Sequence, residues 1–194
     1  MIEAISLGWN CESAVKGVSM GIRNKKANGY TTCPFDECIT NYNGVIECLK
    51  DDFKYFCDPK YLTIIQAPFS TGGIIKGEYL LYNSRYKFIF NHESPGHANF
   101  YLTQNWSGGI THYINNNFEK FIERYERRIN NFRKYVSTNP ITFIISKFNS
   151  DVSLLRETLH ITYPSLVFNI LHLTPSEPEE LVNQHNELMN IIPV

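Results

Sequence analysis

The chain has 194 residues, a formal net charge of −1 at pH 7 and a hydrophobic content of 43%. A net charge near zero provides no overall attraction for nucleic acid or acidic membranes, so we expect partners to bind at a local site. No apolar run approaches the roughly 18 residues that cross a bilayer, and the N-terminus lacks a signal-peptide pattern. We therefore expect a soluble protein that binds neither membranes nor nucleic acid.

The five cysteines are an odd set without a CxxC pair: Cys11, Cys33, Cys38, Cys48 and Cys57. A chain of this length does not depend on disulfides for its stability. We therefore expect reduced thiols and a cytoplasmic location.

The N-terminal segment predicts a strand, a tight turn and a helix. Residues 2–7, IEAISL, suit a short strand, and residues 11–22, CESAVKGVSMGI, carry apolar residues at helical spacing. Gly17 weakens the helix prediction. The following segment, residues 24–37, has the composition of a loop.

A second helix is expected next, followed by strands. Its apolar face consists of Val45, Ile46, Leu49, Phe53 and Phe56. Residues 61–66, 72–82 and 86–92 then show strand-type apolar runs separated by turn residues. The last two of these runs predict a hairpin. Residues 93–117, rich in Gly, Asn and Ser, predict a long functional loop.

The strongest helical pattern covers residues 118–136. One face carries the apolar residues Phe118, Phe121, Ile122, Tyr125, Ile129 and Phe132. Four arginines occupy other positions: Arg124, Arg127, Arg128 and Arg133. They alternate with glutamates, so we interpret them as a solvated helix surface rather than an anion site.

The C-terminal part alternates strand, helix, strand and helix, at residues 140–146, 151–162, 166–173 and 178–192. Such alternation predicts a parallel βαβα unit. We therefore expect one α/β domain covering residues 1–194, with a mixed β-sheet flanked by helices.

Cys11 is the first candidate for chemistry. A cysteine in the first turn of a helix lies among unpaired N–H groups and at the positive end of the helix dipole. Lowering a thiol pKa from about 8.5 to about 6.5 takes roughly 2.7 kcal/mol, and a helix terminus supplies at most about 2. Glu12 opposes the shift, so a second positive group is required, and a histidine is the natural one.

His92 is the best placed of the six histidines, because it follows the apolar strand pattern YKFIFNH and borders the Gly-rich loop. His97 and His112 lie in that loop. The other three, His160, His172 and His185, fall in periodic elements and are expected to be structural or surface residues. The HESPGH segment has the wrong spacing for a zinc helix and contains a proline, so we expect no metal site.

Asp36, in the segment CPFDE, follows a phenylalanine that should be buried. Its carboxylate is expected to orient a catalytic histidine, to pair with Arg23, or simply to cap a turn. No phosphate-binding or dinucleotide fingerprint occurs, so no cofactor is expected.

Several motifs follow one another in a recognisable order: SLGWNCESA, GIR, PFD, DDF, FNHE and YERRINNF. As a set they resemble a family described as "putative papain-like cysteine peptidases", which occurs in bacteria, eukaryotes and large DNA viruses. Its members share the progression SLGxxCxxA, PFDW, FxHD and RRI.RF. If this chain is viral, the cytoplasm would be that of the host.

The resemblance implies a nucleophile at Cys11 and a general base at His92. Two positions depart from the family pattern, because Glu37 replaces the usual Trp and Glu93 replaces an Asp. The partner of the imidazole is therefore either Glu93 or Asp36. The alternating C-terminal half suits an α/β sheet better than the architecture of papain, so the resemblance applies to the Cys–His chemistry only.

Our first hypothesis is a cysteine-dependent acyl-transfer enzyme, a peptidase or an amide hydrolase such as a deamidase, that acts on a protein or peptide. Asn10 and the N–H group of Cys11 would bind the oxyanion. Substrate contacts are expected from Trp9, Arg23 and Glu93. The alternative is a non-catalytic α/β module that binds a peptide, glycan or nucleotide, with Cys11 as an ordinary thiol. The oligomeric state does not follow from the sequence.

Overall fold

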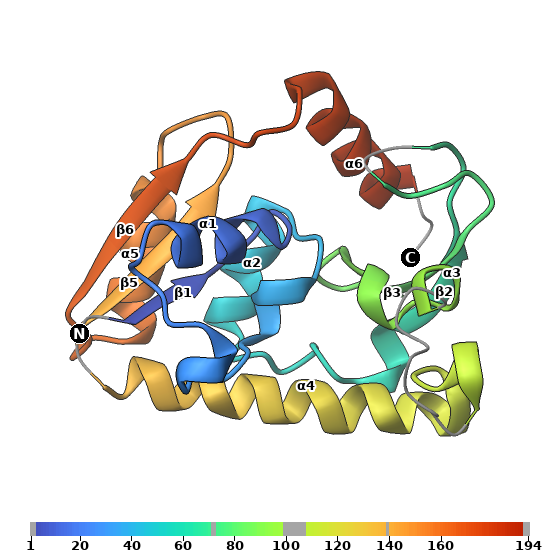
Figure 1. Cartoon of the computed structure of the whole chain (residues 1–194), viewed down its shortest axis with the longest axis horizontal. Coiled ribbons are helices and arrows are strands. Elements are labelled where there is room, and N and C mark those ends of the chain that lie inside the picture. Colours follow the sequence, from blue (N-terminus) through green and yellow to red (C-terminus); the bar gives the residue numbers. More distant parts are fainter. Residues whose placement is uncertain (1–2, 71–72, 99–107, 139, 192–194) are drawn as a thin grey trace.

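The computed structural model describes residues 3–70, 73–98, 108–138 and 140–191 (Figure 1). The prediction of an α/β fold is confirmed. None of the helices in these ranges is both long enough and apolar enough to span a bilayer.

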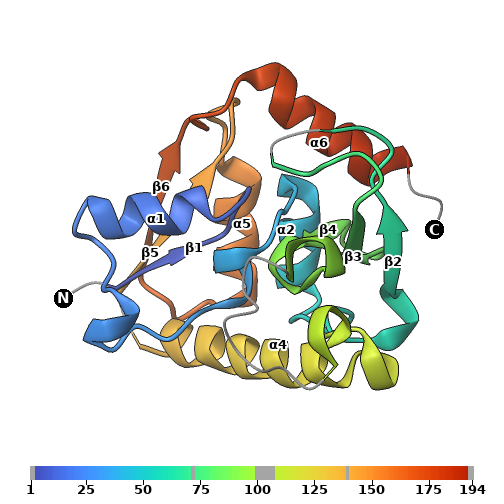
Figure 2. The same cartoon turned by 45° about the vertical axis from the view of Figure 1, so that its right-hand side comes forward.

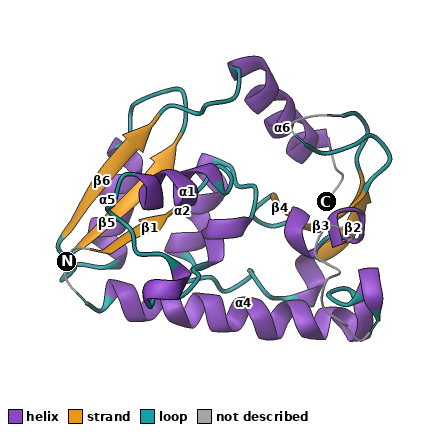
Figure 3. Cartoon of the chain, in the orientation of Figure 1, coloured by secondary structure: helices purple, strands orange, loops and turns teal. Residues whose placement is uncertain are grey.

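A parallel sheet contains the strands β1 (Glu3–Ser6), β5 (Ile141–Ser146) and β6 (Phe168–Leu173), in the order β1-β5-β6. The helix α1 (Glu12–Ser19) lies on one face of this sheet and α5 (Ser153–Thr162) on the other (Figure 3). α5 connects β5 to β6, which confirms the predicted parallel βαβ unit.

An antiparallel sheet contains β2 (Leu62–Gln66), β3 (Tyr79–Asn83) and β4 (Phe88–Phe90). β3 and β4 form the expected hairpin. Parallel and antiparallel strands thus occupy two sheets, where we expected one mixed sheet. The sheets stay separate because the segment between them, at Ile39, pairs with β4 by only one isolated bridge, to Ile89.

Helix α2 (Tyr42–Lys50) is shorter than its apolar pattern indicated. The expected continuation to Phe56 is wrong, because Asp52 and Phe53 adopt positive φ angles of 46° and 62° and so break the helix. Phe53 and Phe56 are nevertheless buried, since the chain turns back into the same core. The pattern therefore predicted burial correctly and helical geometry only in part.

Helix α4 (Asn115–Val136) runs along one side of the molecule, past the parallel sheet and the antiparallel sheet (Figure 1). Its predicted apolar face is confirmed, with Phe121, Tyr125, Ile129 and Phe132 buried. These residues meet rings from the other elements in an aromatic core. Its members include Phe35, Phe53, Phe56, Phe88 and Phe90.

Gly17 lies where α1 packs on the sheet. A side chain there would bring a Cβ atom to 2.7 Å from Ile144 Cδ1 and 3.3 Å from Arg23 Cβ. The residue that weakened the helix prediction is therefore the one that allows α1 to approach β5.

The C-terminal helix α6 (Glu179–Ile191) extends from the side of the parallel sheet toward β2 (Figure 2). The smaller helix α3 (Pro95–Ala98) follows β4. α6 contributes Val182 to a second apolar cluster that also contains Trp9 and residues of the antiparallel sheet. His185 of α6 is fully buried, and its ring centroid lies 5.2 Å from that of Trp9.

The docking of α6 should depend on pH through His185. Burial lowers the pKa of His185 to about 4. Because the unfolded side chain has a pKa near 6.5, the docked helix has its full stability above that pH and loses up to about 3 kcal/mol as the pH falls toward 4. Limited proteolysis of the chain beyond residue 174 should accelerate between pH 7.5 and pH 5.

The variant His185→Phe keeps a ring against Trp9 and removes the titrating group, so its proteolysis should show no such acceleration. His160→Gln, at an exposed position, is the matched control and should behave like the parent. An unchanged pH response in His185→Phe would contradict the assignment.

Candidate active site

Cys11 lies at the start of α1, directly after the carboxyl end of β1. α1 and α5 cover opposite faces of the sheet (Figure 3), and open α/β sheets bind ligands at the carboxyl ends of adjacent strands whose helices lie on opposite faces, as β1 and β5 do here. Cys11 is exposed, whereas the other cysteines are buried or half-buried. Among the five thiols, this one is the most accessible to a substrate.

The turn before α1 is held by hydrogen bonds on both sides. The Gly8 carbonyl accepts from Ser13 Oγ at 2.6 Å and from the N–H group of Ser146 at 2.9 Å. Asn10 Oδ1 accepts from the N–H group of Glu12 at 2.9 Å. This contact uses the oxygen of the Asn10 amide and not its nitrogen, so the nitrogen is compatible with the predicted role as an oxyanion donor.

The surroundings of Cys11 favour the neutral thiol. Although Cys11 is exposed, neighbouring protein atoms displace part of the water around its thiol and raise its pKa, and the negative charges of Glu37, Glu12 and Glu177 raise it further. The backbone N–H group of Cys11 acts in the opposite direction. The expectation that Glu12 opposes thiolate formation is confirmed, and the helix terminus does not overcome it. Glu37 and Glu177 are influences that the sequence analysis missed.

His92 lies in the short 3₁₀ helix η4 (Asn91–Glu93), immediately after β4, as its position at a strand end predicted. The backbone around it is fixed by Ser94. The hydroxyl of Ser94 donates to the Phe90 carbonyl at 2.6 Å and accepts from the N–H group of Leu81 at 2.8 Å. η4 is thus attached to both strands of the hairpin.

One extended segment connects the turn of Cys11 with the turn of His92. Thr40 donates its N–H group to the Trp9 carbonyl at 2.6 Å, and Ile39 exchanges two hydrogen bonds with Ile89, of 2.8 and 3.0 Å. Cys11 follows two residues after Trp9, and His92 three residues after Ile89.

Asp36 is buried in a network with Arg23. Its Oδ2 atom accepts from Arg23 Nη2 at 3.0 Å, from Tyr30 Oη at 3.0 Å and from the N–H group of Cys33 at 2.7 Å. The structure therefore shows two of the three expected roles, the pair with Arg23 and the cap of the local turn. Burial raises the pKa of Asp36 despite the charge of Arg23. A role beside the imidazole stays a prediction.

Arg23 was expected to contact the substrate, but its side chain is only 5% exposed and faces Asp36. Its guanidinium also stacks over the Tyr30 ring, 3.9 Å from the centroid. These contacts leave little of Arg23 accessible to a ligand.

Removing Arg23 should be costly, because it leaves the Asp36 carboxylate buried without a countercharge. Arg23→Met should lower the free energy of unfolding by about 3–5 kcal/mol in urea denaturation. The matched control is Arg133→Met, which breaks the exposed pair with Asp52 and should cost less than about 1 kcal/mol. Equal losses in the two variants would contradict the importance of burial here.

Glu93 was expected to assist the imidazole or bind substrate, yet its carboxylate is directed at α4. Glu93 Oε2 accepts from Tyr125 Oη at 3.1 Å. Glu93 Oε1 lies 2.8 Å from Arg124 Nε and 3.6 Å from Arg128 Nη1. Glu93 is fully buried in this network. It therefore attaches η4 to α4, and its catalytic or substrate role stays a prediction.

Glu37 reaches the same two arginines from the other side. Its Oε2 atom accepts from Arg128 Nη2 and lies 3.3 Å from Arg124 Nη2, and its Oε1 atom pairs with Lys26. Burial alone would raise the pKa of Glu37, but Arg128 and Lys26 lower it to about 2. Glu37 is therefore ionised at every physiological pH.

The interpretation of the α4 arginines as a solvated surface is wrong for Arg128, whose side chain is 4% exposed. The sequence did contain a signal. Position 128 lies three residues after Tyr125 and four before Phe132, which places it on the apolar stripe of the helix. A cation on such a stripe requires buried carboxylates, which Glu37 and Glu93 supply from two distant loops.

Trp9, a third expected substrate contact, is buried against α6. Its Nε1 atom and both ring nitrogens of His185 are buried without a hydrogen-bond partner among the described residues. Of the other histidines, His172 contacts the Lys147 carbonyl at 2.7 Å and His160 packs on Phe168, as structural residues do. The side chain of His97 lies outside the described residues.

No group of three His, Cys, Asp or Glu side chains that could hold a metal ion occurs in the ranges that the structure describes.

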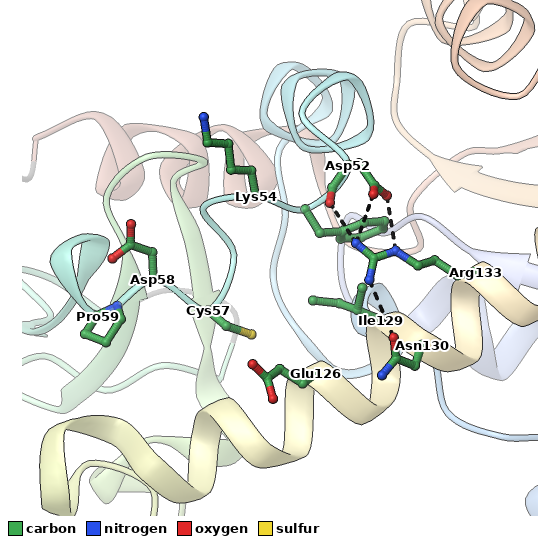
Figure 4. Close-up of a pocket in the computed structure, with 10 residues that line it drawn as sticks. Asp52, Lys54, Cys57, Asp58, Pro59, Glu126, Ile129, Asn130 and Arg133 are labelled. Atoms are coloured by element: carbon green, nitrogen blue, oxygen red, sulfur yellow. Dashed lines mark hydrogen bonds and ion pairs between the residues drawn. The ribbon is translucent and has the colours of Figure 1, made fainter.

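A pocket of about 550 Å³ opens elsewhere, between α4 and residues 52–59 (Figure 4). It is bordered by the Asp52–Arg133 ion pair and by Glu126, and the Cys57 thiol points into it. Burial and the charge of Glu126 raise the pKa of Cys57 to about 12, so this thiol is not a nucleophile at neutral pH. None of the predicted catalytic residues lines this pocket.

Comparison with protein families gives one match, to the model of a family described as "putative papain-like cysteine peptidase", over residues 2–174. The chain belongs to this family. Cys11 and His92 both lie within the matched region, whereas α6 follows it. Searches among curated proteins and among solved structures give no match.

Proposed function

We propose that this protein of the papain-like cysteine peptidase family is a cysteine-dependent hydrolase of amide bonds, with Cys11 as the nucleophile and His92 as the proton carrier. The observation that carries the proposal is the accessible position of Cys11 at the carboxyl edge of the parallel sheet. Membership of the family and the attachment of the two turns to one extended segment support it. The proposed substrate is a protein or peptide in the cytoplasm.

The reaction begins with the neutral thiol, because the carboxylates around Cys11 raise its pKa. His92 takes the thiol proton as sulfur attacks the carbonyl carbon, and the carbonyl π electrons move to oxygen. Asn10 and the N–H group of Cys11 donate to that oxyanion. The C–N bond then breaks as the imidazolium protonates the leaving nitrogen, which leaves a thioester.

Hydrolysis completes the cycle. His92 removes a proton from water as its oxygen attacks the thioester carbon, and the C–S bond breaks with return of the proton to sulfur. If the leaving nitrogen belongs to a side-chain amide, the same steps give deamidation, and if an amine replaces water they give transfer. Glu93 contributes by attaching the η4 turn of His92 to α4, and Asp36 contributes by holding the η2 turn through Arg23 and the N–H group of Cys33.

A non-catalytic binding module is the second candidate. The raised pKa of Cys11 favours this candidate, because catalytic cysteines commonly have a lowered pKa and a thiolate at rest. On this view the crevice binds a peptide, glycan or nucleotide, and Cys11 is an ordinary exposed thiol.

Alkylation by iodoacetamide, followed residue by residue with peptide mass spectrometry, distinguishes the two candidates. At pH 7 the parent should be modified first at Cys11, and Cys11→Ser should abolish that modification. His92→Ala should slow it about tenfold or more, because the proton acceptor is lost. His160→Ala and Cys57→Ser are the controls and should leave the rate unchanged.

The pH dependence provides the second readout. In the parent, the alkylation rate should rise over the pH range in which an imidazole loses its proton. In His92→Ala it should rise only at higher pH, where the unassisted thiol ionises. Identical rates and pH profiles in the parent and His92→Ala would exclude the proposed pair and leave the binding module.

A further inference from the structure

Two guanidinium groups of α4 lie between the loop that carries Glu37 and the helix that carries Glu93. Arg128 pairs with Glu37 through Nη2 and with Glu93 through Nη1, and Arg124 pairs with the same two carboxylates. Glu37 is the last residue of the 3₁₀ helix η2 (Pro34–Glu37), and Glu93 is the last residue of η4. One turn of α4 thus joins two loops that are more than fifty residues apart.

Each carboxylate is close to one member of the proposed catalytic pair. η2, which ends at Glu37, packs against β1 and α1, the two elements that flank the turn of Cys11, and the charge of Glu37 raises the pKa of the Cys11 thiol. Glu93 follows His92 directly in the chain and in η4. The two arginines therefore pair with Glu37, whose charge acts on Cys11, and with Glu93, which follows His92. They do not take part in the proposed reaction themselves.

Stability alone is a weak explanation for this cluster. The Arg128 side chain is 4% exposed and that of Glu93 is fully buried, so both charges lost their hydration on folding. A buried ion pair often stabilises a protein no more than apolar residues of the same volume, because desolvation offsets the Coulomb attraction. What the cluster does provide is direction at Glu37, which accepts hydrogen bonds from both guanidinium groups, while Glu93 adds ion pairs with the same two arginines.

We propose that Arg128 is a positioning residue, which fixes the η4 turn of His92 relative to the η2 loop by its hydrogen bond to Glu37 and its ion pair with Glu93. The proposal rests on the proposed function, because the two turns need a fixed relation only if their residues act together. Arg128 is the central member of the cluster. Arg124 is 29% exposed and supports the same arrangement from its solvent side.

A double-mutant cycle between Arg128 and His92 tests the proposal, with the alkylation rate of Cys11 at pH 7 as the readout. Arg128→Gln should lower the rate about tenfold in the parent, because misplacement of a catalytic group by about 1 Å can cost 10²-fold. In the His92→Ala background the same substitution should change the rate less than about twofold, since the group that it positions is gone. Arg133→Gln, on the same helix and at the surface, is the matched control and should have no effect in either background.

A second set of variants covers the case in which Arg128→Gln does not fold. Arg128→Lys keeps the positive charge, but an ammonium group cannot bond both carboxylates in the fixed geometry of a guanidinium. It should fold and still lower the rate in the parent background. Glu37→Gln removes a negative charge that raises the pKa of Cys11. The variant should therefore shift the alkylation profile to lower pH.

The outcomes separate this inference from the proposed function. If His92→Ala slows alkylation while folded Arg128→Gln or Arg128→Lys matches the parent, the positioning role is wrong and the function stands. Equal effects of the Arg128 variants in both backgrounds would also overturn positioning, since they would show a direct charge effect on sulfur. If His92→Ala changes nothing, the proposed function fails and the inference fails with it.

Discussion

The hydrogen bonds made by Ile39 and Thr40 determine the arrangement of the rest of the molecule. On one side they bind the turn that leads from β1 to Cys11, and on the other they bind the strand that leads to His92. Side-chain packing between the parallel and antiparallel sheets would by itself be tolerant of small displacements. Backbone hydrogen bonds allow much less freedom in distance and direction. Main-chain hydrogen bonds therefore determine the approximate relative position of the Cys11 and His92 turns, and side-chain contacts adjust it.

Electrostatics at this site are arranged unlike those of a protein that stores a reactive thiolate. The carboxylates around Cys11 oppose its ionisation, and Arg128, Lys26 and Arg124 are paired with Glu37. A thiol with a raised pKa is oxidised and alkylated more slowly, because the thiolate is the reactive form. In the proposed mechanism, ionisation of Cys11 accompanies substrate binding, when His92 takes the thiol proton. Such a site gains selectivity for its substrate, and the thiol of the free protein is less reactive.

Much of the architecture could be predicted from the sequence, since hydrophobic periodicity reports local geometry. The strands, the βαβ unit and the apolar face of α4 follow from it, and so does the place of Cys11 at a helix start. The errors share a cause. The end of α2 depends on left-handed backbone at Asp52 and Phe53, which no periodic pattern encodes. The burial of Arg128 depends on residues distant in the chain, and so does the covering of Trp9 by α6. Family resemblance indicated the motifs but not which side chains bind one another.

The position of α6 has a consequence for how this protein should be prepared. The family match ends at residue 174, and a recombinant fragment cut there would appear complete by homology. It would nevertheless lose Val182 and His185, and the indole of Trp9 would become part of the solvent-facing surface together with its apolar neighbours from the antiparallel sheet. Such a surface promotes self-association. Aggregation of a fragment trimmed to residues 2–174 would therefore reflect the loss of α6, and not instability of the matched region.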